Sequence, residues 1–182
     1  MIDLPVYTDR LVIRQLEQKD LKAFISFMRN KKLTKYLYYS AEQKTGKGAR
    51  SMFEFVVQSY ATSSPVDAYA IADKGTDEYV GSLGYTQYKE GVLEFYYNII
   101  EGKGGNGYAV EATAGVVDAL PDHLEVRAYC HPDNKAAHAV AKKCGFAPQG
   151  LAYNKNTKSE FELFVKKPVQ GSSAANSVVF MK

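Results

Sequence analysis

The 182-residue sequence has no tryptophan, two cysteines and three histidines. Cys130 and Cys144 are too few for a disulfide framework and form no Cys-x-x-Cys pair, so we interpret both as free thiols. The cysteines and histidines lack metal-ligand spacing, so we expect no metal site. No apolar run approaches the roughly 20 residues that cross a bilayer, and no signal-peptide pattern opens the chain. We therefore expect a cytoplasmic protein with no membrane partner.

Charge and length set further limits. The formal net charge of +3 is too small to predict nucleic-acid binding. A basic cluster at Arg29, Lys31, Lys32 and Lys35 is interpreted as a solvated helix end. A chain of 182 residues can bury one substantial core. We expect a single domain over residues 1–168 and a small, polar C-terminal tail over residues 169–182.

Hydrophobic periodicity predicts a mixed α/β (α+β) fold. Alternating apolar residues and turn signals predict strands over residues 8–15, 68–72, 79–88, 92–100, 124–130, 150–154 and 160–166. Helical spacing predicts helices from Asp20 onward and over residues 49–60, 107–120 and 134–144, and Ser40 to Gln43 has the form of a capping box. The central strands fit an antiparallel meander, and the helix over residues 107–120 fits one parallel crossover.

A glycine cluster is the most informative local feature. An apolar run ends at Ile100, glycines follow at positions 102, 104, 105 and 107, and a helix-forming stretch begins near Tyr108. A strand, a glycine turn and a helix N-terminus together direct backbone N–H groups and the helix dipole at one point. This arrangement predicts a site for a ligand that carries a pyrophosphate.

The cluster satisfies the pattern Gly-x-Gly-x-x-Gly, which is also typical of dinucleotide-binding folds. Only three strands are predicted after it, two of them as a hairpin, and no acidic residue clearly ends the next strand to bind a ribose. A Walker A loop is excluded because Lys103 is followed by glycine. A dinucleotide-dependent oxidoreductase is therefore a weak alternative.

Five motifs follow one another over residues 8–166. They are Thr8-Asp-Arg-Leu-Val-Ile-Arg14 with Asp20, Tyr79-Val-Gly-Ser-Leu-Gly84, Glu94-Phe-Tyr-Tyr97, Gly105-Asn-Gly-Tyr-Ala-Val-Glu-Ala112, and Asn134 with Lys143-Cys-Gly-Phe146. Together they resemble the GNAT superfamily of acyl-CoA-dependent N-acetyltransferases, specifically its RimJ/RimL-like branch. The sequence departs from that pattern at three positions: Gly104 replaces an aromatic residue, Tyr96 a glycine, and Ala137 a serine near the CoA sulfur.

The resemblance implies a GNAT fold, in which four helices flank a mostly antiparallel central sheet whose fourth and fifth strands splay apart. It implies acetyl-CoA as acyl donor and direct transfer, in a ternary complex, to a primary amine on a protein N-terminus or a small molecule. The protein is expected to be a monomer or homodimer. The implied CoA-binding residues are Ile99, Ile100, Gly102, Lys103, Gly104, Gly105, Asn106, Gly107, Tyr108, Ala109, Asn134 and Ala137.

The chemistry also needs a base, because an ammonium group has no lone pair with which to attack. The resemblance places Glu94 on the strand that faces the acceptor, so Glu94 is the candidate base; a surface carboxylate or ion-pair partner is the alternative reading. Because Ala137 cannot donate a proton, Tyr129, His131 and His138 are the candidates for protonating the leaving thiolate. Ala137 also keeps open a catalytically silent CoA-binding or CoA-sensing domain.

Four tyrosines flank the first two helices, where this family forms its acceptor wall: Tyr36, Tyr38, Tyr39 and Tyr60. An aromatic wall suits a peptide or a small aromatic amine, whereas tyrosines that merely cover the edge of a core are the alternative.

Overall fold

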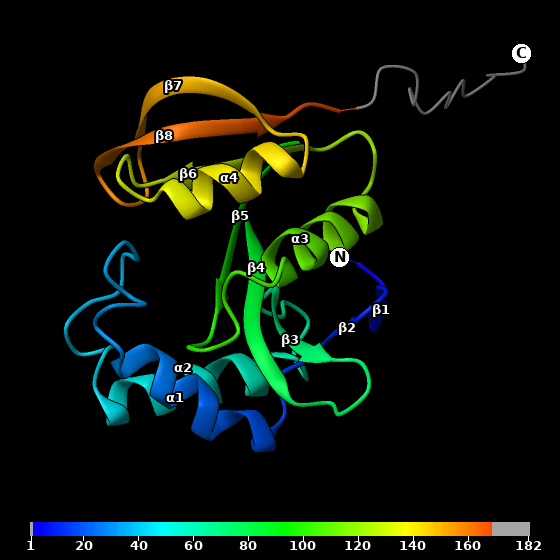
Figure 1. Cartoon of the computed structure of the whole chain (residues 1–182), viewed down its shortest axis with the longest axis vertical. Coiled ribbons are helices and arrows are strands. Elements are labelled where there is room, and N and C mark those ends of the chain that lie inside the picture. The colour runs from blue at the N-terminus through cyan, green and yellow to red at the C-terminus, as the bar shows by residue number, and fades with distance from the viewer. Residues whose placement is uncertain (1, 169–182) are drawn as a thin grey trace, which may run out of the picture.

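The structure is a computed structural model that describes residues 2–168 (Figure 1). Its strands are β1 (Val6–Tyr7), β2 (Leu11–Arg14), β3 (Ala68–Asp73), β4 (Tyr79–Lys89), β5 (Val92–Ile99), β6 (Glu125–Cys130), β7 (Ala147–Asn154) and β8 (Ser159–Lys166). Its α-helices are α1 (Leu21–Arg29), α2 (Gly46–Ser59), α3 (Tyr108–Ala119) and α4 (Lys135–Lys143), and a short 3-10 helix, η1 (Gln18–Asp20), precedes α1. The tail expected over residues 169–182 lies outside the described residues.

The strands form one eight-stranded sheet in the order β1-β2-β3-β4-β5-β6-β8-β7. All neighbouring strands in it pair antiparallel except β5 and β6, which are parallel and joined through α3. The predicted mixed sheet with a central meander and a single parallel crossover is therefore confirmed.

The parallel pair is short. Register partners join β5 and β6 only at Val92↔Glu125, Leu93↔Val126 and Glu94↔Arg127. Beyond Glu94, β5 continues along β4, while β6 beyond Arg127 continues along β8. The sheet therefore opens into a fork between the second halves of β5 and β6, where the splay was expected (Figure 1).

Two hydrophobic clusters cover the sheet. One includes the buried faces of α3 and α4, with Val116, Ala141 and Phe95 among its members. The other is built on α1 and α2, with Phe24 and Phe53 packed at a ring-centroid distance of 5.4 Å. In β3, Tyr69 and Ile71 enter the first cluster and Ala68 and Ala70 the second, as the period-two patterning predicts.

Two local expectations need correction. Helix α2 begins at Gly46, three residues before the predicted start at position 49, because the Thr45 hydroxyl caps it by accepting from Gly48 N at 3.0 Å. The capping box does form, since Ser40 N donates to Gln43 Oε1 and Gln43 N to Ser40 Oγ, but it closes a separate turn before the helix. Strand β1, which pairs with β2, was not predicted.

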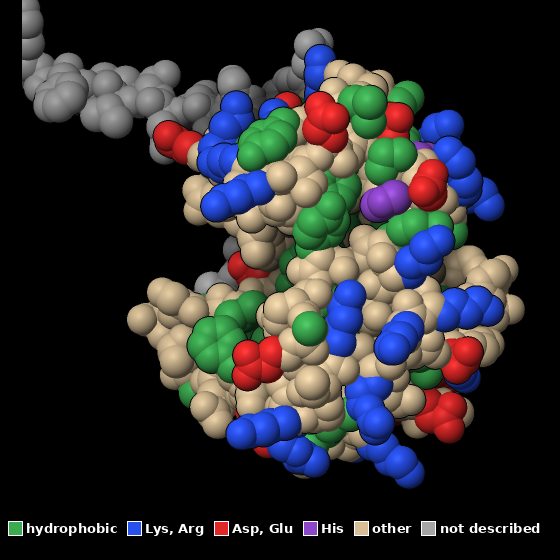
Figure 2. Space-filling view, turned by 90° about the vertical axis from the view of Figure 1, so that its left-hand side faces the viewer, with side chains coloured by type: hydrophobic (Ala, Val, Ile, Leu, Met, Phe, Trp, Pro, Cys, Tyr) green, Lys and Arg blue, Asp and Glu red, His purple; other side chains and the backbone are tan. Residues whose placement is uncertain are grey.

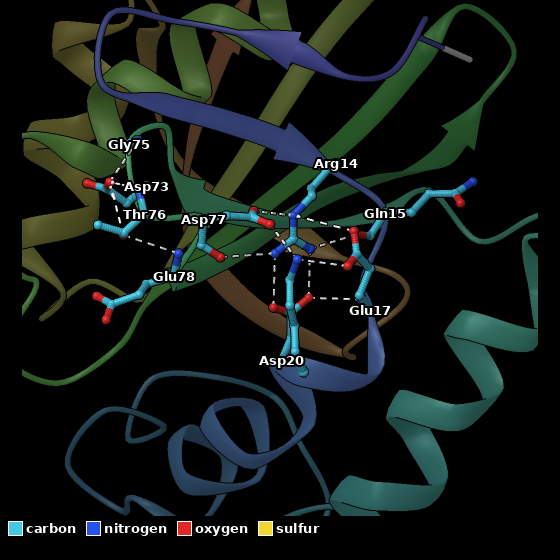
Figure 3. A network of polar contacts seen from close by, with 10 residues as sticks. Arg14, Gln15, Glu17, Asp20, Asp73, Gly75, Thr76, Asp77 and Glu78 are labelled. Carbon is cyan, nitrogen blue, oxygen red and sulfur yellow. Dashed lines mark hydrogen bonds and ion pairs between the residues drawn. The ribbon is translucent and has the colours of Figure 1, made fainter.

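A charged network connects the sheet to the first helix (Figure 3). Arg14, at the end of β2, donates to both carboxylate oxygens of Asp20, at 2.8 and 3.1 Å, and to Asp77 Oδ1 at 2.8 Å. The Asp20 side chain is 1% exposed and also accepts from Glu17 N at 2.8 Å. These bonds raise the pKa of Arg14 above its ordinary value, so the guanidinium stays charged.

No helix within residues 2–168 is long and apolar enough to cross a bilayer.

We expect Asp20→Ala to lower the free energy of unfolding by about 3 kcal/mol, because it leaves a largely buried guanidinium short of its main partner. Urea denaturation measures the change. The matched control is Asp118→Ala, which removes an exposed carboxylate and should stay within about 0.5 kcal/mol of the parent. Equal effects of the two substitutions would contradict a structural role for the network.

Candidate functional site

The glycine loop presents a row of free backbone donors. The N–H groups of residues 104–110 donate no hydrogen bond to any acceptor within residues 2–168. The first donor used is Glu111 N, which bonds to Gly107 O at 3.0 Å inside α3. Free N–H groups at a helix N-terminus bind anions, and the helix dipole adds partial positive charge. The loop therefore fits the pyrophosphate that its sequence predicts.

Left-handed backbone shapes this row. Gly102, Gly105 and Gly107 have φ values of 77°, 81° and 81°, whereas Gly104 lies outside the left-handed region. Gly107 is the N-cap of α3 and turns the chain into the helix. Glycine adopts this conformation without the steric cost that other residues incur.

A clamp from the N-terminal hairpin holds the loop. Arg10 Nε donates to Glu111 Oε2 at 2.7 Å, and Arg10 Nη1 donates to Asn106 O at 3.0 Å. Glu111 Oε1 also accepts from Thr8 Oγ1 at 2.6 Å and from Arg10 N at 2.7 Å. Burial acts to raise the pKa of Glu111, but these hydrogen bonds outweigh it and the pKa lies below the ordinary value. The clamp fixes the first turn of α3 relative to β2.

The fork exposes one edge of β5. Ile100 N donates to Val80 O at 2.9 Å, so this N–H is engaged with β4, although it was expected to be free for a pantetheine arm. Backbone groups alternate in direction along a strand, so those of Tyr97 and Ile99 point away from β4 toward the fork. The backbone groups of β5 that face the fork are therefore those of Tyr97 and Ile99, whereas Ile99 and Ile100 were expected.

The Tyr97 hydroxyl is a buried polar group with no hydrogen-bond partner among the described residues. Tyr97 lies three residues beyond the last pair of the fork, level with Cys130 on β6. Burial raises the pKa of Tyr97 above its ordinary value. A buried hydroxyl without a partner is rare, and a polar ligand in the fork would satisfy it.

On the face of α1 and α2, a cavity of about 540 Å³ reaches the fork. Its lining includes Tyr96 and Tyr97 of β5 and Tyr129 of β6, all beyond the last β5–β6 pair. Aromatic side chains from residues 36–39, α2 and β8 complete its wall. One face of the molecule is deeply hollowed in Figure 2, with hydrophobic side chains along the hollow. A molecule in the cavity can therefore meet a second molecule that enters the fork from the α3 side.

Glu94 lies at the polar end of the cavity. Its Oε1 accepts from Asn154 Nδ2 at 2.9 Å, and its Oε2 from Asn156 Nδ2 at 3.0 Å. Glu94 is partly buried and forms no ion pair with any described residue. The two amide donors therefore orient the carboxylate.

The candidate proton donors lie in different surroundings. Tyr129 lines the cavity, with its ring 6.2 Å from that of Phe161, and burial raises its pKa, which keeps its hydroxyl protonated. The His138 Nε2 lies 3.0 Å from His131 O, and its ring packs on Phe164, so it is engaged away from the cavity lining. The His131 ring stacks on Tyr36 at 4.8 Å.

The remaining predicted residues flank the fork. Asn134 caps α4, its Oδ1 accepting from Ala137 N at 3.1 Å. Ala137 packs on the same cluster as Tyr97 and Ile99. Lys103, Tyr108 and Ala109 belong to the loop and the first turn of α3, and Lys103 Nζ lies 3.7 Å from Glu78.

Sequence reasoning missed the groups that orient others: Arg10, Tyr97, Asn154 and Asn156. Arg10 and Tyr97 stand inside quoted motifs, but the partners of Arg10 lie about 100 residues away in sequence, and the unpaired Tyr97 hydroxyl becomes visible only in the folded chain. The asparagines lie 60 and 62 residues from Glu94, and no local pattern marks that contact.

Comparison with known proteins decides the family. Residues 10–147, more than half of the chain, match the acetyltransferase (GNAT) domain family. This chain belongs to the GNAT acetyltransferases. The chain is 28% identical over 149 residues to the uncharacterized N-acetyltransferase YoaA of Bacillus subtilis, covering 79% of this chain and 83% of that protein. It is 24% identical over 151 residues to the uncharacterized N-acetyltransferase p20 of Bacillus licheniformis, covering 80% and 84%.

Solved GNAT structures share the fold. A GNAT acetyltransferase from Bacillus anthracis aligns with a TM-score of 0.75 at 18% identity, over 91% of this chain and 99% of that one. RimL, a ribosomal L7/L12 α-N-protein acetyltransferase in complex with CoA, aligns at 0.71 with 15% identity, over 90% and 97%. Spermidine N-acetyltransferase from Vibrio cholerae, in complex with CoA and spermine, aligns at 0.69 with 15% identity, over 87% and 95%. At such identities the likeness establishes the GNAT fold of this chain.

We expect Glu111→Gln to destabilise this GNAT domain by about 1 kcal/mol near pH 7, and by progressively less as the pH falls below 4.5 and through the folded-state pKa of Glu111. The folded-state pKa of Glu111 is lowered from 4.5, so its contribution is present above that value and is lost as the pH falls through the folded-state pKa. Urea unfolding over a pH series from 7 downward measures the difference.

The control is Glu160→Gln, which neutralises an exposed carboxylate on β8. A penalty for Glu111→Gln that is independent of pH would contradict the clamp.

Proposed function

We propose that the protein is an N-acetyltransferase that moves an acetyl group from acetyl-CoA to a primary amine, by direct transfer in a ternary complex. The acceptor is a protein N-terminus or a small molecule, and residues 1–168 act as a single domain. The observation that carries the proposal is the meeting of free amides, fork and cavity at one place: the row over residues 104–110 lies at the open end of the fork, and the cavity reaches the fork from the opposite face.

In this proposal the loop binds the pyrophosphate of CoA. The amides of residues 105–109 surround the phosphates, with Gly102, Lys103 and Gly104 on the approach. The edge of β5 at Tyr97 and Ile99 meets the amides of the pantetheine arm, and Asn134 and Ala137 flank that arm from α4. Backbone donors aimed at an anion give affinity without a charged side chain.

Bound acetyl-CoA supplies an activated acetyl thioester. Glu94 takes a proton from the acceptor amine, directly or through a water molecule, so that the nitrogen has a free lone pair. The N–C bond then forms, the nitrogen releases its second proton to solvent, the C–S bond breaks, and the electron pair leaves on sulfur. Tyr129 lines the cavity beside the fork and is assigned to protonate this thiolate, in place of the serine that Ala137 replaces.

We expect Gly105→Ala to weaken CoA binding about 10-fold, because a side chain in the left-handed region costs roughly 1–2 kcal/mol and tilts the amides that follow. Isothermal titration with CoA measures the affinity. Gly104→Ala is the matched control, since its neighbourhood is equally open but its backbone is not left-handed; it should bind within about twofold of the parent. Equal losses at both positions would contradict the assigned geometry of the loop.

We expect Glu94→Gln to lower kcat about 100-fold or more while leaving the Kd for acetyl-CoA unchanged, because an amide cannot accept the proton. Release of the CoA thiol measures turnover, and titration measures affinity. Glu90→Gln, on the exposed turn between β4 and β5, is the control. Full activity of Glu94→Gln would remove Glu94 as the base.

A further inference from the structure

The charges that line the cavity limit the kind of acceptor molecule that it can bind. Glu94 is the only acidic side chain among the described residues that line the cavity, and none of them is lysine, arginine or histidine. Its remaining polar groups are uncharged: the hydroxyls of six tyrosines, and the side chains of Gln43, Asn154, Thr157 and the Ser82–Asn98 pair. In that pair Asn98 Nδ2 donates to Ser82 Oγ at 2.7 Å, so these two groups are largely satisfied by each other.

Charge is thus concentrated at one end of the cavity. The carboxylate of Glu94 lies beside the fork, accepts from two amide donors, and forms no ion pair with any described residue; Arg127, opposite it on β6, pairs with Glu125. A single ammonium or amine fits this end. A second ammonium deeper in the cavity would be stripped of water with no carboxylate to pair with it, which is strongly unfavourable.

The body of the cavity is aromatic and aliphatic. Three of the four tyrosines expected to form a wall, at positions 36, 38 and 39, line it, whereas Tyr60 turns its hydroxyl to the backbone of Leu16 and Ala68. Tyr38 packs edge-on against Phe161 with 5.0 Å between ring centroids. Leu16, Met52 and Val66 supply aliphatic contacts.

Exposed aromatic side chains border the same cavity. Tyr38 and Phe55 are 54% and 65% exposed, although both are large and apolar, and both belong to its lining. Exposed apolar side chains that adjoin an apolar cavity indicate a surface that a ligand covers.

We infer that the acceptor is a primary amine with one positive charge and an aromatic or bulky apolar body. The amine lies at Glu94 and the body lies among residues 36–39, α2 and Phe161. This inference rests on the proposed function. The same chemistry occurs in a free arylalkylamine and in a peptide whose first residue is aromatic. The lack of a second carboxylate among the described residues of the lining disfavours polyamines, whose further ammonium groups would have no partner.

The first test compares acceptors on the full chain with saturating acetyl-CoA, by release of the CoA thiol. Phenethylamine should exceed ethylamine in kcat/KM by about 100-fold, because the phenyl group is buried, and both should be compared with spermidine. In the peptide arm, Phe-Gly-Gly is compared with Gly-Gly-Gly. A preference for the aromatic acceptor in either comparison supports the inference. The comparison that shows it tells whether the acceptor is a free amine or a peptide N-terminus. No preference in both arms, or spermidine as the best acceptor, overturns it.

The second test adds the missing charge. Gln43→Glu places a carboxylate in the cavity with little change of shape, and should raise kcat/KM for at least one linear diamine about 10-fold relative to phenethylamine. Gln58→Glu adds the same charge on the exposed face of α2, outside the cavity, and should leave the ratio unchanged. Equal shifts in both variants overturn the inference.

Titration with acetyl-CoA distinguishes a failure of this inference from a failure of the proposed function. Binding of acetyl-CoA without any preference for apolar amines contradicts the inference alone. Absence of acetyl-CoA binding contradicts the proposed function, and the inference with it.

Discussion

The point at which β5 and β6 stop pairing governs the rest of this structure. After Glu94↔Arg127 each strand keeps its other neighbour, so the sheet remains two well-paired halves with two unpaired inner edges. An unpaired edge inside a sheet carries backbone donors and acceptors that need partners. The buried hydroxyl of Tyr97 adds one more unsatisfied group at the same place. A ligand rich in amides and oxygen atoms meets this need, which connects the topology of the sheet to acyl-CoA chemistry.

The fork can bring a donor and an acceptor together only because the N-terminus of α3 lies at its open end and the cavity lies on the opposite face. The crossover that makes β5 and β6 parallel also places the N-terminus of α3, with its free amides, at the open end, and the Arg10–Glu111 clamp fixes that helix to β2. On the opposite face, α1, α2 and the segment between them enclose the cavity that leads to Glu94. Donor and acceptor therefore approach one point from opposite faces of a single sheet.

Local sequence patterns predicted the fold well because the apolar residues of each strand and helix recur with the period of that element. Alternating residues marked β3, β4 and β5, and the glycine cluster marked the turn into α3. Contacts between distant residues left no such signal. The amides of Asn154 and Asn156 reach Glu94 from another hairpin, and the engagement of Ile100 with Val80 depends on sheet register. The start of α2 was misplaced because the cap at Thr45 overrides the poor helix propensity of Gly46 and Gly48.

A crystal structure of the protein with CoA tests the central claim most directly. The account predicts density for the pyrophosphate against the amides of residues 105–109 and for the pantetheine arm between β5 and β6, with its thiol facing the cavity at Glu94. Density for CoA elsewhere on the surface, or a fork closed by continuous pairing of β5 with β6, would contradict it.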